Sequence, residues 1–230
     1  TADDIAEIHS LAIGASIAIA SGASATSIGI SASIARNEIH SDTEAAIQNA
    51  DIASFLKTSV LAGNGEDSTD ESGTKRSISA IATAASISLA AGNSSAVALS
   101  GAGAEATNKI LGNTRAYASE SSIRSEGDID LKAKDASSIS ATIVAAAIGA
   151  GSIGASVSDN SIGYDSDGER IGNKIEASSL NSTMNAVGAL EVDAESSATI
   201  TANVIAASIA VAKGSGTALS GAGSGVSTTN

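Results

Sequence analysis

The segment Gly127-Asp-Ile-Asp-Leu-Lys-Ala-Lys-Asp-Ala-Ser-Ser-Ile139 returns in altered form as Gly188-Ala-Leu-Glu-Val-Asp-Ala-Glu-Ser-Ser-Ala-Thr-Ile200, 61 residues further along the chain. In both copies apolar residues alternate with polar ones, and apolar positions coincide with apolar positions. Such alternation is typical of a strand with one buried face. Recurrence at a fixed period indicates a repeat architecture, in which each unit stacks on its neighbours.

Other segments repeat over similar distances. Ile8-His-Ser-Leu-Ala12 matches Ile78-Ser-Ala-Ile-Ala82, 70 residues on, and the block Ala98-Leu-Ser-Gly-Ala-Gly103 returns unchanged at Ala218 to Gly223, 120 residues on. We therefore expect one continuous repeat array with units at about 5–76, 77–137 and 138–197, followed by a partial unit at 198–230. We also expect the array to be a segment of a longer chain.

The tract that begins at Ile139 predicts a pair of long strands. Small or apolar residues occupy nearly all of its odd-numbered positions, and the even-numbered positions mix Ser, Thr and Ala with a few branched residues. The second face is thus nearly dry, which suits packing against a neighbouring layer or chain. The odd positions concerned are Ile139, Ala141, Ile143, Ala145, Ala147, Ile153, Ala155 and Val157.

A helix is the alternative for one stretch. Ser41-Asp-Thr-Glu44 resembles a capping box, and Gly63 is suited to ending a helix. The repeat alignment, however, sets Thr43-Glu-Ala45 over Thr114-Arg-Ala116, in a unit without helix signals. We favour strand there. Two polar stretches, 63–76 and 160–172, are expected to be loops outside the regular core.

These patterns predict an all-β fold: a right-handed parallel β-solenoid (β-helix), or a related layered β-rod, built from repeats of about 60 residues. A unit of that length is expected to make about three rungs of roughly 20 residues. At about 4.8 Å per rung, about eleven rungs would form a rod on the order of 50 Å long.

Composition restricts the functional classes. The 230 residues carry a net charge of −13 with no Cys, Pro or Trp, two Tyr and one Phe. A negative field repels nucleic acid, and no apolar run approaches the roughly 20 residues of a membrane helix. We expect neither nucleic-acid binding nor membrane insertion. Without Cys there are no disulfides, and without aromatic residues the core must consist of many small contacts.

The run Asn108-Lys-Ile-Leu-Gly-Asn-Thr-Arg-Ala-Tyr-Ala-Ser119, the segment from Gly127 to Ala133 and the Ala-rich tract ending in Ser100-Gly-Ala-Gly103 resemble repeats of giant bacterial haemagglutinin-like and adhesin-like surface exoproteins. The resemblance extends over essentially the whole chain, although the Gly-Gly-x-Gly-x-Asp calcium-roll repeat is missing. It implies a parallel β-helix or β-rich rod that serves in attachment, aggregation or a surface coat, outside the cell or on its surface.

No catalytic group is indicated, and we expect the chain not to be an enzyme. No Gly-x-Ser-x-Gly nucleophile motif lies at a strand-to-helix turn, and aromatic platforms for sugars are almost absent. His9 and His40 have no metal-ligand spacing around them, so solvated positions are the better interpretation.

One segment has the composition of a metal site. In Asp165-Ser-Asp167-Gly168-Glu169, alternating oxygen ligands precede a Gly turn, as in many calcium loops. Glu176 lies near the closing position but out of register. Asp165 and Asp167 are therefore candidate calcium ligands, with a solvated acidic turn as the alternative. A second, weaker acidic cluster consists of Glu66, Asp67, Asp70 and Glu71.

Together these observations predict a structural repeat of an extracellular filament, sheath or adhesin. Stacked rungs would form a stiff rod that associates laterally or end to end. The expected partners are other copies, adjacent repeats of the same chain, and a host or partner-cell surface. The alternative is a ligand-binding adhesin module that recognises a glycan or a partner-cell protein through its acidic loops.

Overall fold

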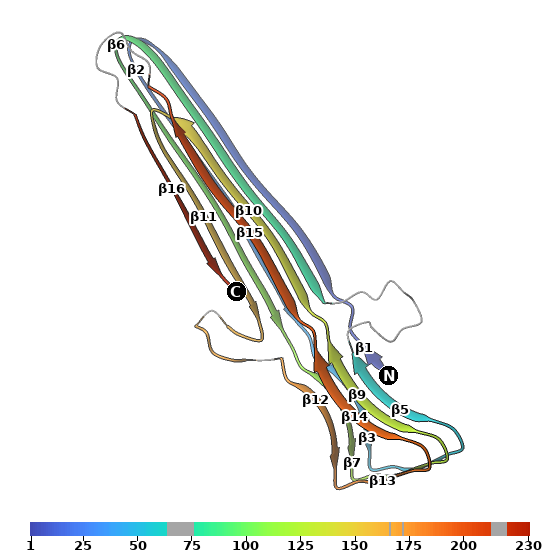
Figure 1. Cartoon of the computed structure of the whole chain (residues 1–230). Coiled ribbons are helices and arrows are strands. Elements are labelled where there is room, and N and C mark those ends of the chain that lie inside the picture. The colour runs from blue at the N-terminus through green and yellow to red at the C-terminus, as the bar shows by residue number, and fades with distance from the viewer. Residues whose placement is uncertain (64–75, 166, 172, 213–219) are drawn as a thin grey trace.

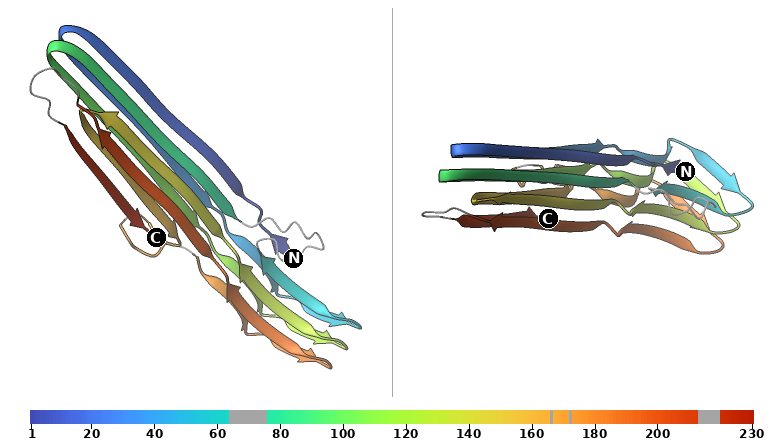
Figure 2. Two further views of the ribbon diagram at one scale, coloured as in Figure 1. Left: turned by 45° about the horizontal axis from the view of Figure 1, so that its top comes forward. Right: turned by 90° about the horizontal axis from the view of Figure 1, so that it is seen from above.

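The computed structural model describes residues 1–63, 76–165, 167–171, 173–212 and 220–230. Within them the fold is an all-β parallel solenoid, and all the named strand pairs are parallel. The chain winds into four coils, each hydrogen-bonded to the next, which appear as stacked layers in Figure 1 and in the right view of Figure 2.

Each coil runs out along the arm and returns. In coils 1 and 2 one long strand makes both runs, in coils 3 and 4 two strands make them, and short strands close coils 1 to 3. A short β1 (Ala2–Asp3) precedes the first coil and pairs with β5. Coil 1 comprises β2 (Glu7–His40), β3 (Thr43–Gln48), β4 (Asp51–Ser54) and β5 (Thr58–Gly63); coil 2 comprises β6 (Ser77–Leu111), β7 (Thr114–Ser119), β8 (Ser122–Ser125) and β9 (Ile129–Asp135); coil 3 comprises β10 (Ser138–Gly149), β11 (Gly151–Ile162), β12 (Ile175–Leu180), β13 (Thr183–Ala186) and β14 (Leu190–Ser196); coil 4 comprises β15 (Thr199–Ala210) and β16 (Gly221–Thr229).

One sequence unit forms one coil, so the expectation of three rungs per unit and eleven rungs in all is wrong. Ile78 pairs with Ile8 on one side and with Ile139 on the other, a full unit away in each direction. The arm strands do not turn every few residues. The stretch from Ser77 to Gly92 alone spans about 50 Å, whereas four coils about 4.8 Å apart make a thin stack. The long dimension therefore lies along the strands (Figure 2).

Two regions differ in their packing. The arm consists of the long out-strands and return strands (β2, β6, β10, β11, β15 and β16), and the base consists of the short strands that close each coil (Figure 1). The base has a conventional aliphatic core in which Ile123, Ile129 and Leu131 are fully buried. The root of the arm is similar, with Ile78, Ile110 and Ile139 buried.

Beyond its root, the arm has small side chains in its interior and large apolar side chains on its outer surface. On the return part of β2, Ser27 and Ser33 are buried while Ile28 and Ile30 point to solvent. The parity expected across residues 139–157 holds only as far as Ala147. Beyond it the turn between β10 and β11 reverses the pattern, because Ser152, Ser156 and Ser158 are buried while Ile153, Ala155 and Val157 face outward.

The inversion follows from how closely the two sheets of the arm approach. Ser86 Oγ donates to the carbonyl of Gly29 at 2.7 Å, and Ser88 Oγ donates to that of Ser27 at 2.9 Å. One serine side chain thus bridges the gap to the opposite backbone. The separation of the two sheets is far smaller than the roughly 10 Å between ordinary packed sheets. A Cβ on Gly14 would lie 2.3 Å from the carbonyl oxygen of Ala32. Only small side chains fit inside.

A row of asparagine amides runs through all four coils. Asn37 donates to Asn108 at 2.7 Å, Asn108 to Asn160 at 2.8 Å, and Asn160 to Asn230 at 2.9 Å. Asn108 and Asn160 are buried. Because Asn108 and Asn160 each donate to one neighbour and accept from the other, the row satisfies side chains that would be costly to bury alone.

The structure does not pair the two identical blocks at 98–103 and 218–223 position by position. Leu99 pairs with Gly151, which pairs in turn with Gly221, so the two segments are displaced by two residues from the identity alignment. A slip of two keeps every side chain on the same face. The alternation in the sequence therefore does not distinguish the two registers.

The stretch from Ser41 to Gly63 is strand, as favoured from the repeat alignment, and the helical alternative is wrong. β3 pairs with β7 in the expected register, with Thr43 beside Thr114. The second expected loop lies between Ile162 and Ile175. Most of the first, residues 64–75, lies outside the described residues.

The close approach of the sheets predicts opposite outcomes for two Gly→Ala variants. Gly14→Ala is expected to destabilise the fold by about 1–3 kcal/mol, because its methyl group overpacks against the Ala32 carbonyl. A Cβ at Gly101 would meet nothing within 4 Å, so for Gly101→Ala we expect no loss of stability or a gain of up to about 1 kcal/mol. Urea denaturation measures both, and equal stabilities would contradict the narrow interior.

The amide row predicts a second effect. Asn108→Ala removes an acceptor from Asn37 and a donor from Asn160. Leaving a buried polar group unpaired costs about 1–3 kcal/mol, so we expect a loss of about 2–3 kcal/mol. The control is Asn185→Ala at an exposed site in β13, expected to stay within about 0.5 kcal/mol of the parent in the same denaturation assay. A neutral Asn108 variant would show that the row does not stabilise the stack.

Candidate interaction surfaces

Charge is partitioned between the base and the arm. Asp, Glu, Lys and Arg are absent from residues 8–35, 77–104 and 136–158, and these stretches form most of the arm strands. A protein with 37 charged side chains (12 basic, 25 acidic) therefore has an arm almost free of them. Depletion of charge marks the centre of protein interfaces more clearly than apolarity does.

The outer surface of the out-strands is a flat, apolar β face, termed the isoleucine face. Its exposed side chains are large, and Ile17 is 72% accessible. One row bears isoleucine in every coil and is termed the isoleucine ridge: Ile17, Ile87, Ile148 and Ile209. A row of alanines lies beside it: Ala15, Ala85, Ala146 and Ala207.

The outer surface of the return strands, termed the glycine face, has a different relief. Ile30 and Ile153 are 74% and 67% accessible, and between them lies Gly101. A shallow apolar depression of about 630 Å³ covers this region. One row has only small residues and is termed the small-residue trough: Ala32, Gly103, Ala155 and Gly225.

Most glycines of this face have no packing role within the chain; Gly151 is different, because a Cβ there would lie 2.9 Å from the Leu99 side chain. A Cβ on any of five of them would meet nothing within 4 Å. Glycine weakens a strand and commonly marks the close approach of another backbone or ligand. The five residues are Gly101, Gly103, Gly221, Gly223 and Gly225.

The candidate calcium residues lie in a small hairpin closed by the antiparallel bridge between Tyr164 and Arg170. Asp165 Oδ1 accepts the backbone N–H groups of Asp167 at 2.9 Å and Glu169 at 2.8 Å, which is the geometry of a side-chain-capped turn. Gly168 adopts a φ of 78° at the turn. This arrangement accounts for the Asp-Ser-Asp-Gly spacing, and calcium binding by Asp165 and Asp167 stays a prediction.

The other candidate ligands are not gathered into one centre. Among the described residues, no group of three or more His, Asp or Glu side chains is placed to hold a metal ion. His9 contacts Glu7 at 2.7 Å on the surface, and His40 is exposed at the end of β2. The acidic cluster Glu66, Asp67, Asp70 and Glu71 lies outside the described residues.

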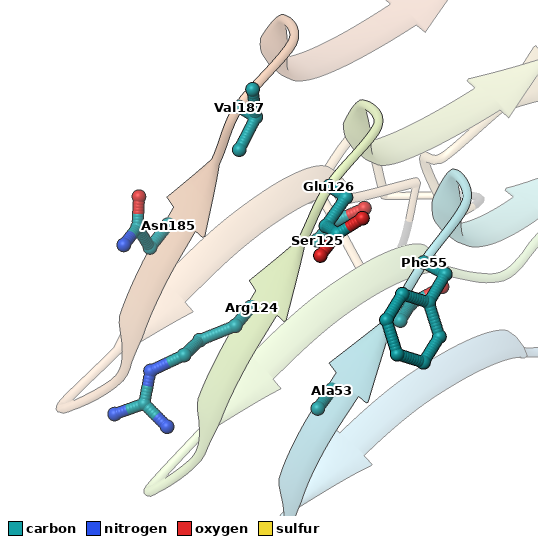
Figure 3. A pocket seen from close by; sticks show the side chains of 8 residues that line it. Ala53, Phe55, Arg124, Ser125, Glu126, Asn185 and Val187 are labelled. Carbon is teal, nitrogen blue, oxygen red and sulfur yellow. The ribbon is translucent and has the colours of Figure 1, made fainter.

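The tip of the base has a shallow hollow of about 320 Å³ (Figure 3). Three short strands, β4, β8 and β13, contribute its walls, with Phe55 at one side and Arg124 and Asn185 along the outer surface. Phe55 and Val187 are about four-fifths exposed. Ser54, Ser125 and Glu126 also line the hollow, and the Ser125 hydroxyl donates to the Leu56 carbonyl.

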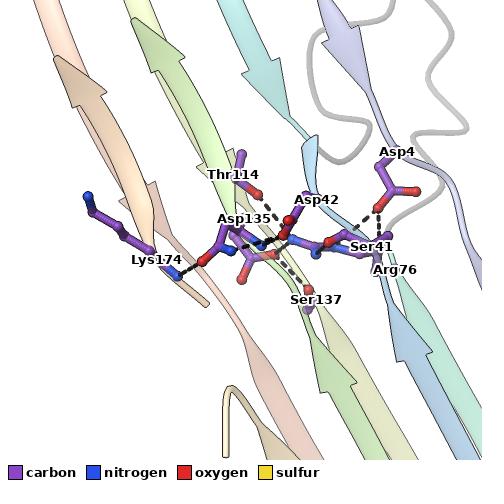
Figure 4. Close-up of polar contacts among 9 residues, drawn as sticks. Asp4, Ser41, Asp42, Arg76, Thr114, Asp135, Ser137 and Lys174 are labelled. Atoms are coloured by element: carbon purple, nitrogen blue, oxygen red, sulfur yellow. Dashed lines mark hydrogen bonds and ion pairs between the residues drawn. The ribbon is translucent and has the colours of Figure 1, made fainter. Parts of the chain in front are cut away.

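A buried cation joins the arm to the base (Figure 4). Arg76 is fully buried and donates to Asp135 at 2.8 Å and to Thr114 at 3.1 Å. It also donates to the Ser41 carbonyl at 3.1 Å. A Cβ at Gly112 would lie 1.8 Å from that same carbonyl oxygen. The cluster ties coil 1 to coil 2 through side-chain and backbone contacts of a fully buried cation, which is a structural role.

No protein-family model matches the chain, and neither a curated protein nor a solved structure shows significant similarity to it. The relation to surface exoproteins therefore remains a prediction from sequence. Within the described residues, no helix is long and apolar enough to cross a membrane. The rows on the two arm faces went unnoticed in the sequence, because they become visible only when strand parity is combined with the register between coils.

Contacts between coils in the base shift two titrations in the same direction. A hydrogen bond to Asp130, with its charge, raises the pKa of Lys57, and a hydrogen bond from Tyr117 to Glu44 at 2.6 Å raises the pKa of Tyr117. Both groups hold their protons more tightly in the folded state than in the unfolded state. Their contribution to stability is complete below the ordinary values of 10.5 and 10.0 and is lost as pH rises through the folded pKa values.

We therefore expect the free energy of unfolding to fall between about pH 9.5 and pH 12, beyond the ordinary pKa values of these groups. Urea titrations across this range measure the slope. The combined variant Lys57→Gln and Tyr117→Phe is expected to flatten it, whereas Lys109→Gln serves as a surface control. An equal slope in the combined variant would contradict the assignment.

Proposed function

We propose that the chain is a structural module of an extracellular filament, sheath or adhesin, in which stacked coils form a stiff body. The observation that carries this proposal is the parallel register of the arm strands across four coils, in which each residue lies beside its counterpart in the next coil, with one shift between Gly22 and Ser24. Stacks of this kind gain stability from neighbour contacts and so extend readily.

The edges of the stack support the same role. Among the described residues, the arm strand β2 pairs with β6 alone, and β15 and β16 pair with β10 and β11 alone. Each outer coil thus presents free backbone donors and acceptors along one side. Such edges are templates for further strands. Adjacent repeats of the same chain, or other copies, are the proposed partners, outside the cell or at its surface.

A binding module is the second candidate, and one feature favours it. A depression of about 690 Å³ lies beside the Asp165 hairpin, and Tyr164, Asp165 and Asn173 line it together with the amide row at Asn160. An exposed tyrosine with nearby amide and carboxylate groups is a combination suited to a glycan or to a polar segment of a partner-cell protein.

One pair of measurements separates the two roles. Electron micrographs of the purified chain are expected to show uniform elongated assemblies, and a glycan array is expected to show no binding. The hairpin variant Tyr164→Ala with Asp165→Ala should assemble as the parent does. Glycan binding that this variant abolishes, from a chain that does not assemble, would replace the structural role with the binding role.

A further inference from the structure

We propose that the small-residue trough on the glycine face binds the isoleucine ridge of a second copy. This inference rests on the proposed structural function and names the surface and the partner of its lateral contact. The two faces lie on opposite sides of the thin arm, so each copy offers one ridge and one trough. The contact is heterologous, and its repetition builds an open-ended lateral layer.

The first argument is that the glycines of the trough have no packing role within the chain. Gly103 and Gly225 lie in the trough with open space where a side chain would be, so nothing in the chain itself requires them. Glycine there lowers the floor of the trough to the backbone. A neighbouring backbone or a bulky side chain from outside can then approach closely.

The second argument is the match of the two reliefs. The ridge has one isoleucine per coil and the trough one small residue per coil, and both rows run along the stacking axis. Successive coils are about 4.8 Å apart in each row, so the two steps are equal. A ridge of one copy can therefore enter a trough of another along its whole length.

The third argument is charge. With a net charge of −13, copies of this chain repel one another at their bases. The two arm faces are where this repulsion is weakest, because residues 8–35, 77–104 and 136–158 carry no Asp, Glu, Lys or Arg. The charged side chain at the margin of the trough, Glu105, forms an ion pair with Arg36 at 3.2 Å.

The fourth argument is area. Nine residues along the strand, from Ile28 to Arg36, have partners in all four coils. They span about 30 Å, and four coils span about 19 Å, so one face covers roughly 600 Å². Two faces together approach about 1,200 Å², the lower end of the range for specific interfaces. The contact is large enough to be specific and small enough to be reversible.

The test uses the whole 230-residue chain and a pair of matched variants. Gly103→Val fills the trough and leaves the ridge intact. Because a Cβ at this position meets nothing within 4 Å and valine favours strands, the melting temperature should be unchanged or higher. The combined variant Ile87→Thr and Ile148→Thr makes the ridge polar and leaves the trough intact. Asn185→Val, at an exposed strand position in the base, is the control.

Sedimentation velocity over a range of concentrations is the readout. Each arm variant alone is expected to associate at least tenfold more weakly than the parent, and Asn185→Val as the parent does. An equimolar mixture of the two arm variants should form a discrete 1:1 complex, because the ridge of one enters the trough of the other. Should Gly103→Val not fold, the loss of association by the ridge variant carries the test.

Three outcomes would overturn the proposal. Gly103→Val or the ridge variant associating as the parent does would show that the trough or the ridge is not in the contact. Failure of the mixture to form a 1:1 complex would indicate that like faces pair instead. If micrographs show rods that grow end to end regardless of these variants, the proposed lateral contact is wrong, whereas the proposed structural role is retained. A parent chain that never assembles would remove the structural role itself.

Discussion

The close approach of the two arm sheets is the constraint on which the rest of the structure depends. Because a serine side chain spans the gap from Ser86 to the backbone at Gly29, the interior of the arm beyond its root admits only small side chains such as Gly, Ala and Ser. The large aliphatic side chains must then lie outside. Each isoleucine left in solvent forgoes about 1.5–3 kcal/mol of burial. The arm exposes many of them and so leaves this contribution unused within the single chain.

The base and the arm divide the work of the fold. The base contains the aliphatic core around Ile123 and Leu131, the buried Arg76 and most of the ion pairs between coils. The arm relies on backbone ladders and on serine hydroxyls that bond to the facing sheet. Charge is thus concentrated in the base, where copies of the chain repel one another most strongly, and is nearly absent from the arm.

The sequence was sufficient for the strand class, the parallel stacking and the offsets of 61 and 70 residues, because each depends on local alternation and recurrence. It was insufficient for the shape of a coil. Strands usually run about five or six residues, so short rungs were expected, yet the turns lie only at sites such as Gly149 to Gly151. The hairpin at Asp165 likewise shows that a calcium-like spacing also suits a capped turn. The outward rows were hidden because alternation gives two faces without saying which is inside.

The buried asparagine row has a consequence for how such a chain acquires its pairing. Neighbouring coils built from alternating small residues could slide past one another by two positions with little change in contact. The amide row penalises such sliding, since a slip of two residues would place the Asn160 carboxamide beside Ala106 or Ile110 in place of Asn108. A single column of polar side chains thus selects one register among several of similar energy. The shapes of the small side chains alone are too uniform to select it.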